Sequence, residues 1–276
     1  MKKQPLFVAR FDNDWTSSMR RLLDAAGFAA VLQSLSKPIL IKPNLVTTDA
    51  PPITTPVSLV EAIVDFIRSS RPETEIIIGE GCGSLDYETA EPFKRLGYVD
   101  LAERKSLALV DLNHAPLTTL SDPRCLRFPT FHMPKIVLES YVVSVPVLKA
   151  HSFSEVTLTM KTMLGVAPPR HYNAGGWQKS AFHTRIHEAI LDLNRYRTPD
   201  FTVLDATIGM KDAHLWGAVC SPPPNQIVAG FDPVAIDAYG ATLLKRDWRR
   251  VDHIRLADGV LGFGDPERIM HSFSGK

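Results

Sequence analysis

The chain has 276 residues, of which 45% are hydrophobic and 22% charged, so it can bury a sizeable core. Its 31 basic and 30 acidic side chains leave a formal charge of +1, which argues against nucleic-acid binding. The cysteines, Cys82, Cys125 and Cys220, are far apart, which argues against a disulfide framework, a zinc ribbon and a cysteine-ligated iron–sulfur cluster. This cysteine usage fits a reducing compartment.

The amino-terminal segment is basic, but its apolar run of about five residues is shorter than the ~7–15 of a signal peptide. No segment approaches the ~18 apolar residues that a membrane span requires. We therefore expect a cytoplasmic protein that does not enter a membrane.

Apolar runs typical of strands alternate with segments of helical spacing. In chain order we predict a strand at 6–9, a helix at 15–35, a strand at 39–42, a helix at 56–70, a strand at 75–79, a helix at 86–96, a strand at 107–112, an edge or hairpin strand at 124–131, a strand at 141–148, a helix at 181–196, strands at 201–205 and 226–229, and a helix at 232–244. This alternation predicts an α/β, Rossmann-like fold with a mainly parallel sheet flanked by helices.

No linker or internal repeat divides the chain. We therefore predict one compact domain over 1–276, whose lobes could enclose a cleft. A Pro- and Gly-rich loop insertion is expected at about 165–182.

Polar side chains follow several predicted strands at the carboxyl end, where ligands bind in parallel sheets. Lys42 and Asn44 follow the second strand, whereas Lys149 and His151 follow the most strand-like run, and Lys161 lies in the apolar segment LTMKTM. Lysines are rarely buried without a partner, although each alone could extend its apolar stem along the core. Together, the three lysines predict a binding site for a carboxylate or phosphate.

The stretch GEGCGS at 79–84 follows the third main strand, and Gly81 at its centre allows close backbone approach. Its backbone N–H groups could form an anion nest, but a structural turn is an equal alternative, and the G-x-G-x-x-G fingerprint is absent. Arg170, in the loop insertion, is a further candidate anion ligand. Cys82 is interpreted as a packing residue, with a reactive thiol as the alternative.

His183 and His187 are four residues apart on a predicted helix, so they would share a face. Such a pair can ligate a divalent metal, although the zincin pattern H-E-x-x-H and a third ligand are both missing. The alternatives are a polar surface pair and an extension of the basic pocket by His183.

Asp205 ends a predicted strand and is a candidate general base or metal ligand; Lys149 and His187 are the other candidate catalytic residues. Asp237 lies in a helix that is apolar almost all round, so we expect it to be buried and paired with a lysine of the cleft. Asp232 precedes a proline and is expected to cap that helix. The chain has neither G-x-S-x-G nor a Walker A motif.

Taken together, seven stretches resemble the domain of unknown function 362 family in their order and spacing, over about 39–262. They are IKPNLV (41–46), GEG (79–81), PVLKAH (146–151), TLTMKTMLG (157–165), HEAILDLN (187–194), VLDATIG (203–209) and AGFDPVAIDAYGA (229–241).

This resemblance implies a prokaryotic protein, and many members carry an appended ferredoxin-type domain with two iron–sulfur clusters. The chain lacks those cysteines, so no cluster is expected here, and a ferredoxin-like partner would be a separate protein. A distant fold-level similarity to nickel-pincer lactate racemases does not imply nickel.

The family's polar positions fall on nine residues of this sequence: Lys42, Asn44, Lys149, Lys161, His187, Asp192, Asp205, Asp232 and Asp237. There are two departures from its pattern. Thr162 replaces the usual Asn, and MKDAHLWG (210–217) replaces a Gly-Pro-rich turn. His214 and Trp216 are therefore expected to change ligand preference in this member.

These observations leave three readings: an enzyme or a plain binding module for a small anion, or a metal- or cofactor-binding redox partner. The sequence names neither the substrate nor the cofactor, and it carries no signal for oligomeric state.

Overall fold

The computed structural model describes residues 1–176 and 178–272. Its strands are β1 (Leu6–Arg10), β2 (Ile39–Pro43), β3 (Ile76–Glu80), β4 (Ala108–Asp111), β5 (Leu117–Ser121), β6 (Thr130–Pro134), β7 (Tyr141–Val145), β8 (Val147–His151), β9 (Glu155–Thr157), β10 (Phe201–Met210), β11 (Gln226–Gly230) and β12 (Ile269–Ser272). The α-helices are α1 (Trp15–Ala25), α2 (Phe28–Ser34), α3 (Val57–Ser70), α4 (Ala90–Arg95), α5 (Tyr98–Lys105), α6 (Lys135–Glu139), α7 (Thr159–Thr162), α8 (Pro169–Tyr172), α9 (Ile186–Tyr196), α10 (Pro233–Leu243) and α11 (Asp252–Ala257). Short 3-10 helices are η1 (Met163–Val166), η2 (Ser180–His183) and η3 (Trp248–Arg250).

A ten-stranded sheet forms the centre of the molecule, in the order β12-β1-β11-β10-β7-β2-β3-β4. The pairs from β4 to β10 along this order are parallel, and β11 is antiparallel to both of its neighbours. β8 continues beyond β7, pairs in parallel with β10 and forms an antiparallel hairpin with β9. The predicted α/β, mainly parallel fold is confirmed.

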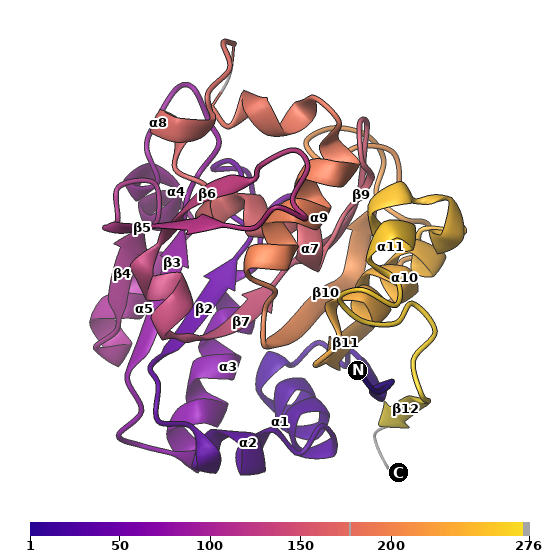
Figure 1. Ribbon diagram of the computed structural model, residues 1–276. Helices are drawn as coiled ribbons and strands as arrows, with labels where there is room; N and C mark the ends of the chain where they lie inside the picture. The colour runs from indigo at the N-terminus through magenta and orange to yellow at the C-terminus, as the bar shows by residue number, and fades with distance from the viewer. Residues whose placement is uncertain (177, 273–276) are drawn as a thin grey trace.

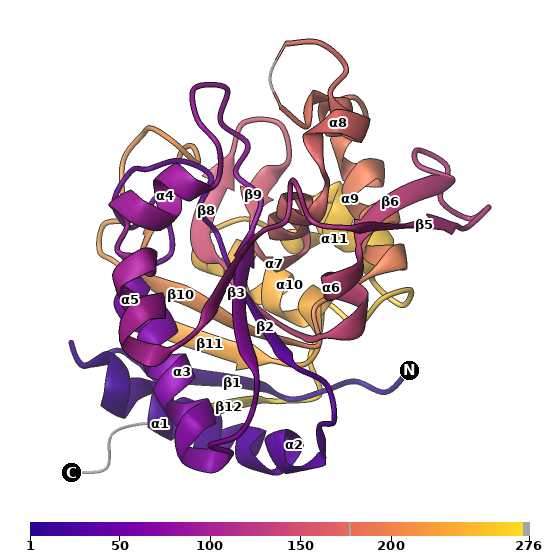
Figure 2. The ribbon, with the colours of Figure 1, turned by 90° about the vertical axis from the view of Figure 1, so that its left-hand side faces the viewer.

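Helices cover both faces of the sheet (Figures 1 and 2), and each face has its own apolar core. One core joins the sheet to α1, α2, α3 and α5, and the other joins it to α7, α9, α10 and α11. β5 and β6 form a separate two-stranded sheet. Within the described residues, the chain is therefore built on one continuous sheet, and two lobes of similar size are not seen.

Three predicted helices or strands differ from the observed ones, and glycine, proline and a turn account for the differences. The helix predicted at 15–35 is two helices, because Gly27 adopts a left-handed conformation with φ 65° between them. The strand predicted at 141–148 is β7 and β8, interrupted by Pro146, which lacks an N–H for the ladder. The hairpin strand predicted at 124–131 is mostly the turn between β5 and β6.

The predicted insertion at 165–182 contains α8 and the start of η2, and residue 177 lies outside the described residues. In Figures 1 and 2, α8 and the β8–β9 hairpin lie at the upper end of the sheet, with α1 and α2 at the lower end. The carboxyl ends of the parallel strands are therefore covered mainly by segments from the second half of the chain.

Truncation of an aromatic stack in the core should strongly destabilise the protein. Phe28 is fully buried, and its ring centroid lies 4.4 Å from that of Phe201. We expect Phe28→Ala to lower the free energy of unfolding by about 3–5 kcal/mol, measured by urea denaturation. Leu126→Ala, at a side chain that is 77% exposed, is the control and should change it by less than about 0.5 kcal/mol. Equal effects of the two variants would contradict this packing.

Candidate functional site: a lysine-rich cluster at the carboxyl edge of the sheet

A buried ion pair joins the ends of β2 and β3. Lys42 Nζ lies 2.9 Å from each carboxylate oxygen of Glu80, and the two side chains are 0% and 4% exposed. Glu80 also accepts hydrogen bonds from the backbone N–H groups of Gly81 and Leu45. Burial lowers the pKa of Lys42, and the charge of Glu80 opposes that shift. Since this carboxylate already has four close donor contacts, its role here is to hold the strand ends together.

The backbone of η1 packs directly on this ion pair. A Cβ atom at Gly165 would overlap Glu80 Oε1 and lie 2.5 Å from Lys42 Nζ, so only glycine fits there without movement. Buried Lys179 then ties the layers together, because its Nζ donates to the carbonyls of Gly81 (2.6 Å) and Gly165 (3.1 Å). Gly81 is thus part of the site through close backbone approach, as a Cβ there would overlap the Gly165 carbonyl.

Lys149 is the second fully buried lysine, and it lies in the middle of β8 instead of following a strand as predicted. Its Nζ donates to Asn44 Oδ1 at 2.8 Å and to the carbonyl of Ile53 at 2.6 Å, so it has neutral partners and no paired carboxylate. Burial, reinforced by the nearby charge of Lys161, lowers the pKa of Lys149 to about 7. Asn44, predicted as an anion ligand, therefore supports Lys149.

Lys161 differs from the other three lysines because its ammonium makes no hydrogen bond or ion pair with any residue that the structure describes. Lys161 is half-buried, and desolvation by the protein around it lowers its pKa to about 8. Its charge depresses the pKa values of Lys149, His151, His183 and His214. We call these five residues the Lys161 cluster.

The histidines of the Lys161 cluster are held as neutral rings. His151 is buried, and its Nδ1 accepts hydrogen bonds from the backbone N–H groups of Phe153 (3.0 Å) and Ser154 (3.2 Å). The neutral ring must therefore carry its proton on Nε2. His214 stacks on it at 4.1 Å between centroids. Burial lowers the pKa of His183 to about 4 and that of His214 to about 3.

The charge balance of this region defines what it can do chemically. Lys42, Lys149 and Lys179 are buried and Lys161 is half-buried, yet Glu80 is the one carboxylate that pairs with any of them among the described residues. Buried charge without a counter-ion costs several kcal/mol, and proteins relieve it by losing the proton or binding an opposite charge. The cluster is therefore suited to a small anion, with Lys161 as its uncommitted donor.

The two aspartates predicted as counter-charges are used elsewhere. Asp205 is buried, but its Oδ1 accepts from the N–H and hydroxyl of Thr207, and burial raises its pKa. Asp237 accepts from the backbone N–H groups of Thr159 and Met160, and burial raises its pKa to about 8. The prediction that Asp237 is buried is confirmed, and the prediction that it pairs with a lysine is wrong.

His183 and His187 do not share a helix face, so the geometric basis of the predicted metal pair is wrong. His183 ends η2, whereas α9 begins at Ile186. His183 lies near His151, and His187 Nδ1 instead lies 3.1 Å from Nδ1 of buried His253. Among the described residues, metal-ligating atoms gather in one other group, Glu88, Asp111 and His114, which is largely exposed.

Three further sequence-level interpretations are settled by local contacts. Arg170 is exposed on α8, beside the stacked rings of His171 and His132, so it is not buried with the lysines. Asp232 caps α10, as predicted. Burial raises the pKa of the Cys82 thiol, which does not favour a reactive thiolate.

Sequence reasoning missed Glu80 and Lys179. Glu80 directly follows the apolar run of β3, and the β2–β3 register extends to place it near Lys42, so strand pairing could have revealed it. Lys179 lies in a loop with no distinctive pattern, and it reaches Gly81 only through the tertiary fold.

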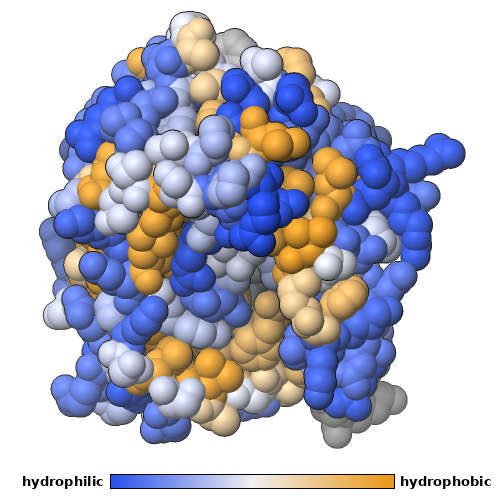
Figure 3. Space-filling model, in the orientation of Figure 1, coloured by the Kyte–Doolittle hydropathy of each residue, from blue (hydrophilic) through white to orange (hydrophobic). Residues whose placement is uncertain are grey.

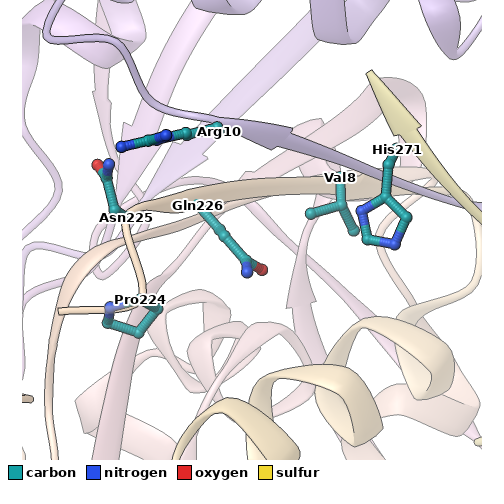
Figure 4. Close-up of a pocket in the computed structure, with 6 residues that line it drawn as sticks. All are labelled: Val8, Arg10, Pro224, Asn225, Gln226 and His271. Atoms are coloured by element: carbon teal, nitrogen blue, oxygen red, sulfur yellow. The ribbon is translucent and has the colours of Figure 1, made fainter. Parts of the chain in front are cut away.

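Two open hollows of the surface lie away from the Lys161 cluster. One of about 290 Å³ lies over β1 and β11, and Figure 4 shows Arg10, Gln226 and His271 among its lining residues. Another of about 440 Å³ is lined by residues that include Lys37, Arg197 and Asp200. On the face drawn in Figure 3, apolar residues form separate patches divided by hydrophilic ones. The case for the cluster therefore comes from its chemistry and burial.

The fold and this site define an α/β protein with a basic cluster at the carboxyl edge of a parallel sheet. The chain belongs to the family described as Domain of unknown function (DUF362), whose model matches residues 39–242. A relative, "Thylakoid-associated protein sll1697" of Synechocystis sp., is 24% identical over 243 residues, covering 84% of this chain and 70% of the relative. None of the helices in the described residues is long and apolar enough to cross a membrane.

The contact between Gly165 and the Lys42–Glu80 pair should make this position intolerant of a side chain. We expect Gly165→Ala to lower the free energy of unfolding by about 3 kcal/mol, because the added methyl group must displace a buried ion pair. Gly83→Ala, where a Cβ would meet nothing within 4 Å, is the matched control for urea denaturation. A Gly165→Ala protein as stable as the Gly83→Ala protein would contradict the contact.

The depressed pKa of Lys149 should make the free protein more stable as pH rises. Between pH 8 and 10 the unfolded chain keeps the Lys149 proton, at its ordinary pKa of 10.5, whereas the folded state has released it near pH 7. The folded state binds fewer protons, so stability increases with pH in this window. Lys149→Met should lower that slope by about 1.4 kcal/mol per pH unit in urea titrations.

Lys37→Met, at an exposed lysine before the opposite end of β2, is the control for this pH series. Its slope should match that of the unsubstituted protein. An unchanged slope in Lys149→Met would show that Lys149 keeps an ordinary pKa.

Proposed function

We propose that the protein binds a small molecule with a carboxylate or phosphate group, and that Lys161 is its principal ligand. The observation that carries this proposal is a half-buried lysine whose ammonium has no hydrogen bond or ion pair with any described residue, and whose charge acts on another lysine and three histidines. A charge-assisted hydrogen bond to an anion would satisfy it.

Each component of the site has a separate part in this proposal. Lys42, Glu80 and Lys179 form the support, because their polar atoms already bond one another or the backbone of Gly81 and Gly165. Lys149 has two neutral oxygen partners and adds a second positive charge near Lys161. The neutral His151 ring offers an Nε2–H donor that carries no charge, since its Nδ1 is already an acceptor.

The position of the site supports ligand binding on general grounds. Lys42 lies next to the carboxyl end of β2, and Lys149 lies in β8, beyond the carboxyl end of β7, at the edge where open α/β sheets bind ligands. Membership of the family supports the fold of this edge and does not name a ligand. Thr207 donates two hydrogen bonds to Oδ1 of Asp205, and no hydrogen bond or ion pair among the described residues joins Asp205 to the lysines, so the proposal is binding of an anion and no reaction is assigned.

The test measures the binding of inorganic phosphate and of acetate to the protein, by calorimetry and by thermal unfolding. Lys161→Met should weaken binding by about 10- to 150-fold, the usual effect of losing hydrogen bonds from a charged group. In anion-free buffer the same variant should be at least as stable as the unsubstituted protein, because a half-buried charge without a protein partner has been removed.

Affinity should also fall as pH rises through about 8, where Lys161 loses its charge. Lys37→Met, which removes an exposed lysine at the other end of β2, should bind both anions like the unsubstituted protein. Equal binding by Lys161→Met, or failure of both anions to bind the unsubstituted protein, would overturn the proposal.

A further inference from the structure

Two exposed aromatic side chains converge on the Lys161 cluster from different parts of the chain. Phe153 lies in the β8–β9 hairpin turn and is 62% exposed, and Trp216 lies in the β10–β11 loop and is 63% exposed. In Figures 1 and 2 this hairpin and this loop lie side by side. No other phenylalanine, tyrosine or tryptophan in the described residues is exposed to this extent.

Ring contacts connect these two side chains through the histidines of the cluster. Phe153 contacts His183 edge-on with 5.8 Å between centroids, and His183 lies 6.3 Å from His151. His151 stacks on His214 at 4.1 Å, and His214 lies 5.9 Å from Trp216. Phe153 also lies 6.1 Å from His151, so the five rings form one connected group that has buried His151 at its centre and the exposed Phe153 and Trp216 at its border.

Single exposed aromatics are common and need no explanation. Here, however, two of them border the same cluster, and a second observation points to a missing partner. The Nδ1 atom of His214 is buried and has no hydrogen-bond partner in the described part of the chain. Polar atoms in such positions normally find a partner, so a group that enters beside Trp216 would supply it.

We propose that Phe153 and Trp216 hold the body of the bound anion, and that this body is a planar aromatic ring. The inference rests on the proposed anion site: the charged group binds Lys161, while the ring packs between the two aromatic side chains beside the histidine row. Neutral imidazoles favour this arrangement, because uncharged rings present flat, weakly hydrated surfaces for stacking. The ligand class is therefore an aromatic carboxylate or an equivalent aromatic anion.

Benzoate and cyclohexanecarboxylate form a matched pair for the test, since they share a charge and a similar size but differ in aromaticity. We expect the unsubstituted protein to bind benzoate about fivefold or more tightly than cyclohexanecarboxylate, measured by calorimetry, because two ring contacts contribute. The double variant Phe153→Leu/Trp216→Leu should bind the two compounds equally. It should fold normally, because both side chains are exposed.

Acetate, which has no ring, separates this inference from the proposed function. Its affinity should be the same in the double variant and the unsubstituted protein, and it should be lost in Lys161→Met. If acetate binds through Lys161 but benzoate and cyclohexanecarboxylate bind equally, the aromatic inference alone is overturned. A benzoate preference that persists in the double variant also overturns it, and failure of all three carboxylates to bind overturns both proposals.

Discussion

The ion pair between Lys42 and Glu80 is the contact on which the carboxyl edge of the sheet depends. It closes the ends of β2 and β3, and Glu80 simultaneously fixes the backbone that leaves both strands. The close approach of Gly165 then brings η1, and with it the segment that carries Lys161, onto the strand ends. A buried pair of this kind contributes little net stability, but loss of either partner is costly, so it specifies one arrangement of these segments.

The lysines of this edge therefore divide by what they already contact. Three of them are bound to protein oxygens: a carboxylate for Lys42, an amide and a carbonyl for Lys149, and two carbonyls for Lys179. The Lys161 ammonium has none of these, although the residue is half-buried. The amino-acid composition does not reveal this difference between the lysines. The difference depends on which oxygen atoms the fold brings close to each ammonium group.

Two aspartates that were candidates for pairing or capping accept hydrogen bonds from backbone N–H groups. Asp237 receives the first N–H groups of α7, and Asp232 those of α10. A carboxylate that accepts two backbone N–H groups is satisfied without a cation, so it does not have to face a lysine even when it is buried. This explains why the site retains excess positive charge.

The sequence by itself determined the alternation of strands and helices, the mainly parallel sheet, and the placement of Lys42 near the carboxyl end of β2. Those features follow from local apolar patterns and from the general geometry of parallel sheets. It also singled out Gly81, His151 and Lys161, all of which lie at the carboxyl edge. His214 and Trp216, which depart from the family pattern, also lie there.

Only the tertiary structure decided which of these side chains share a site. Glu80 and Lys179 are 99 positions apart in the numbering and are linked through Gly81, a contact that no local pattern records. His183 and His187 are close in sequence but face different partners, since α9 begins between them. Hydrogen-bond partners and enclosure of charge depend on packing between distant segments, and the sequence pattern constrains mainly the conformation of nearby ones.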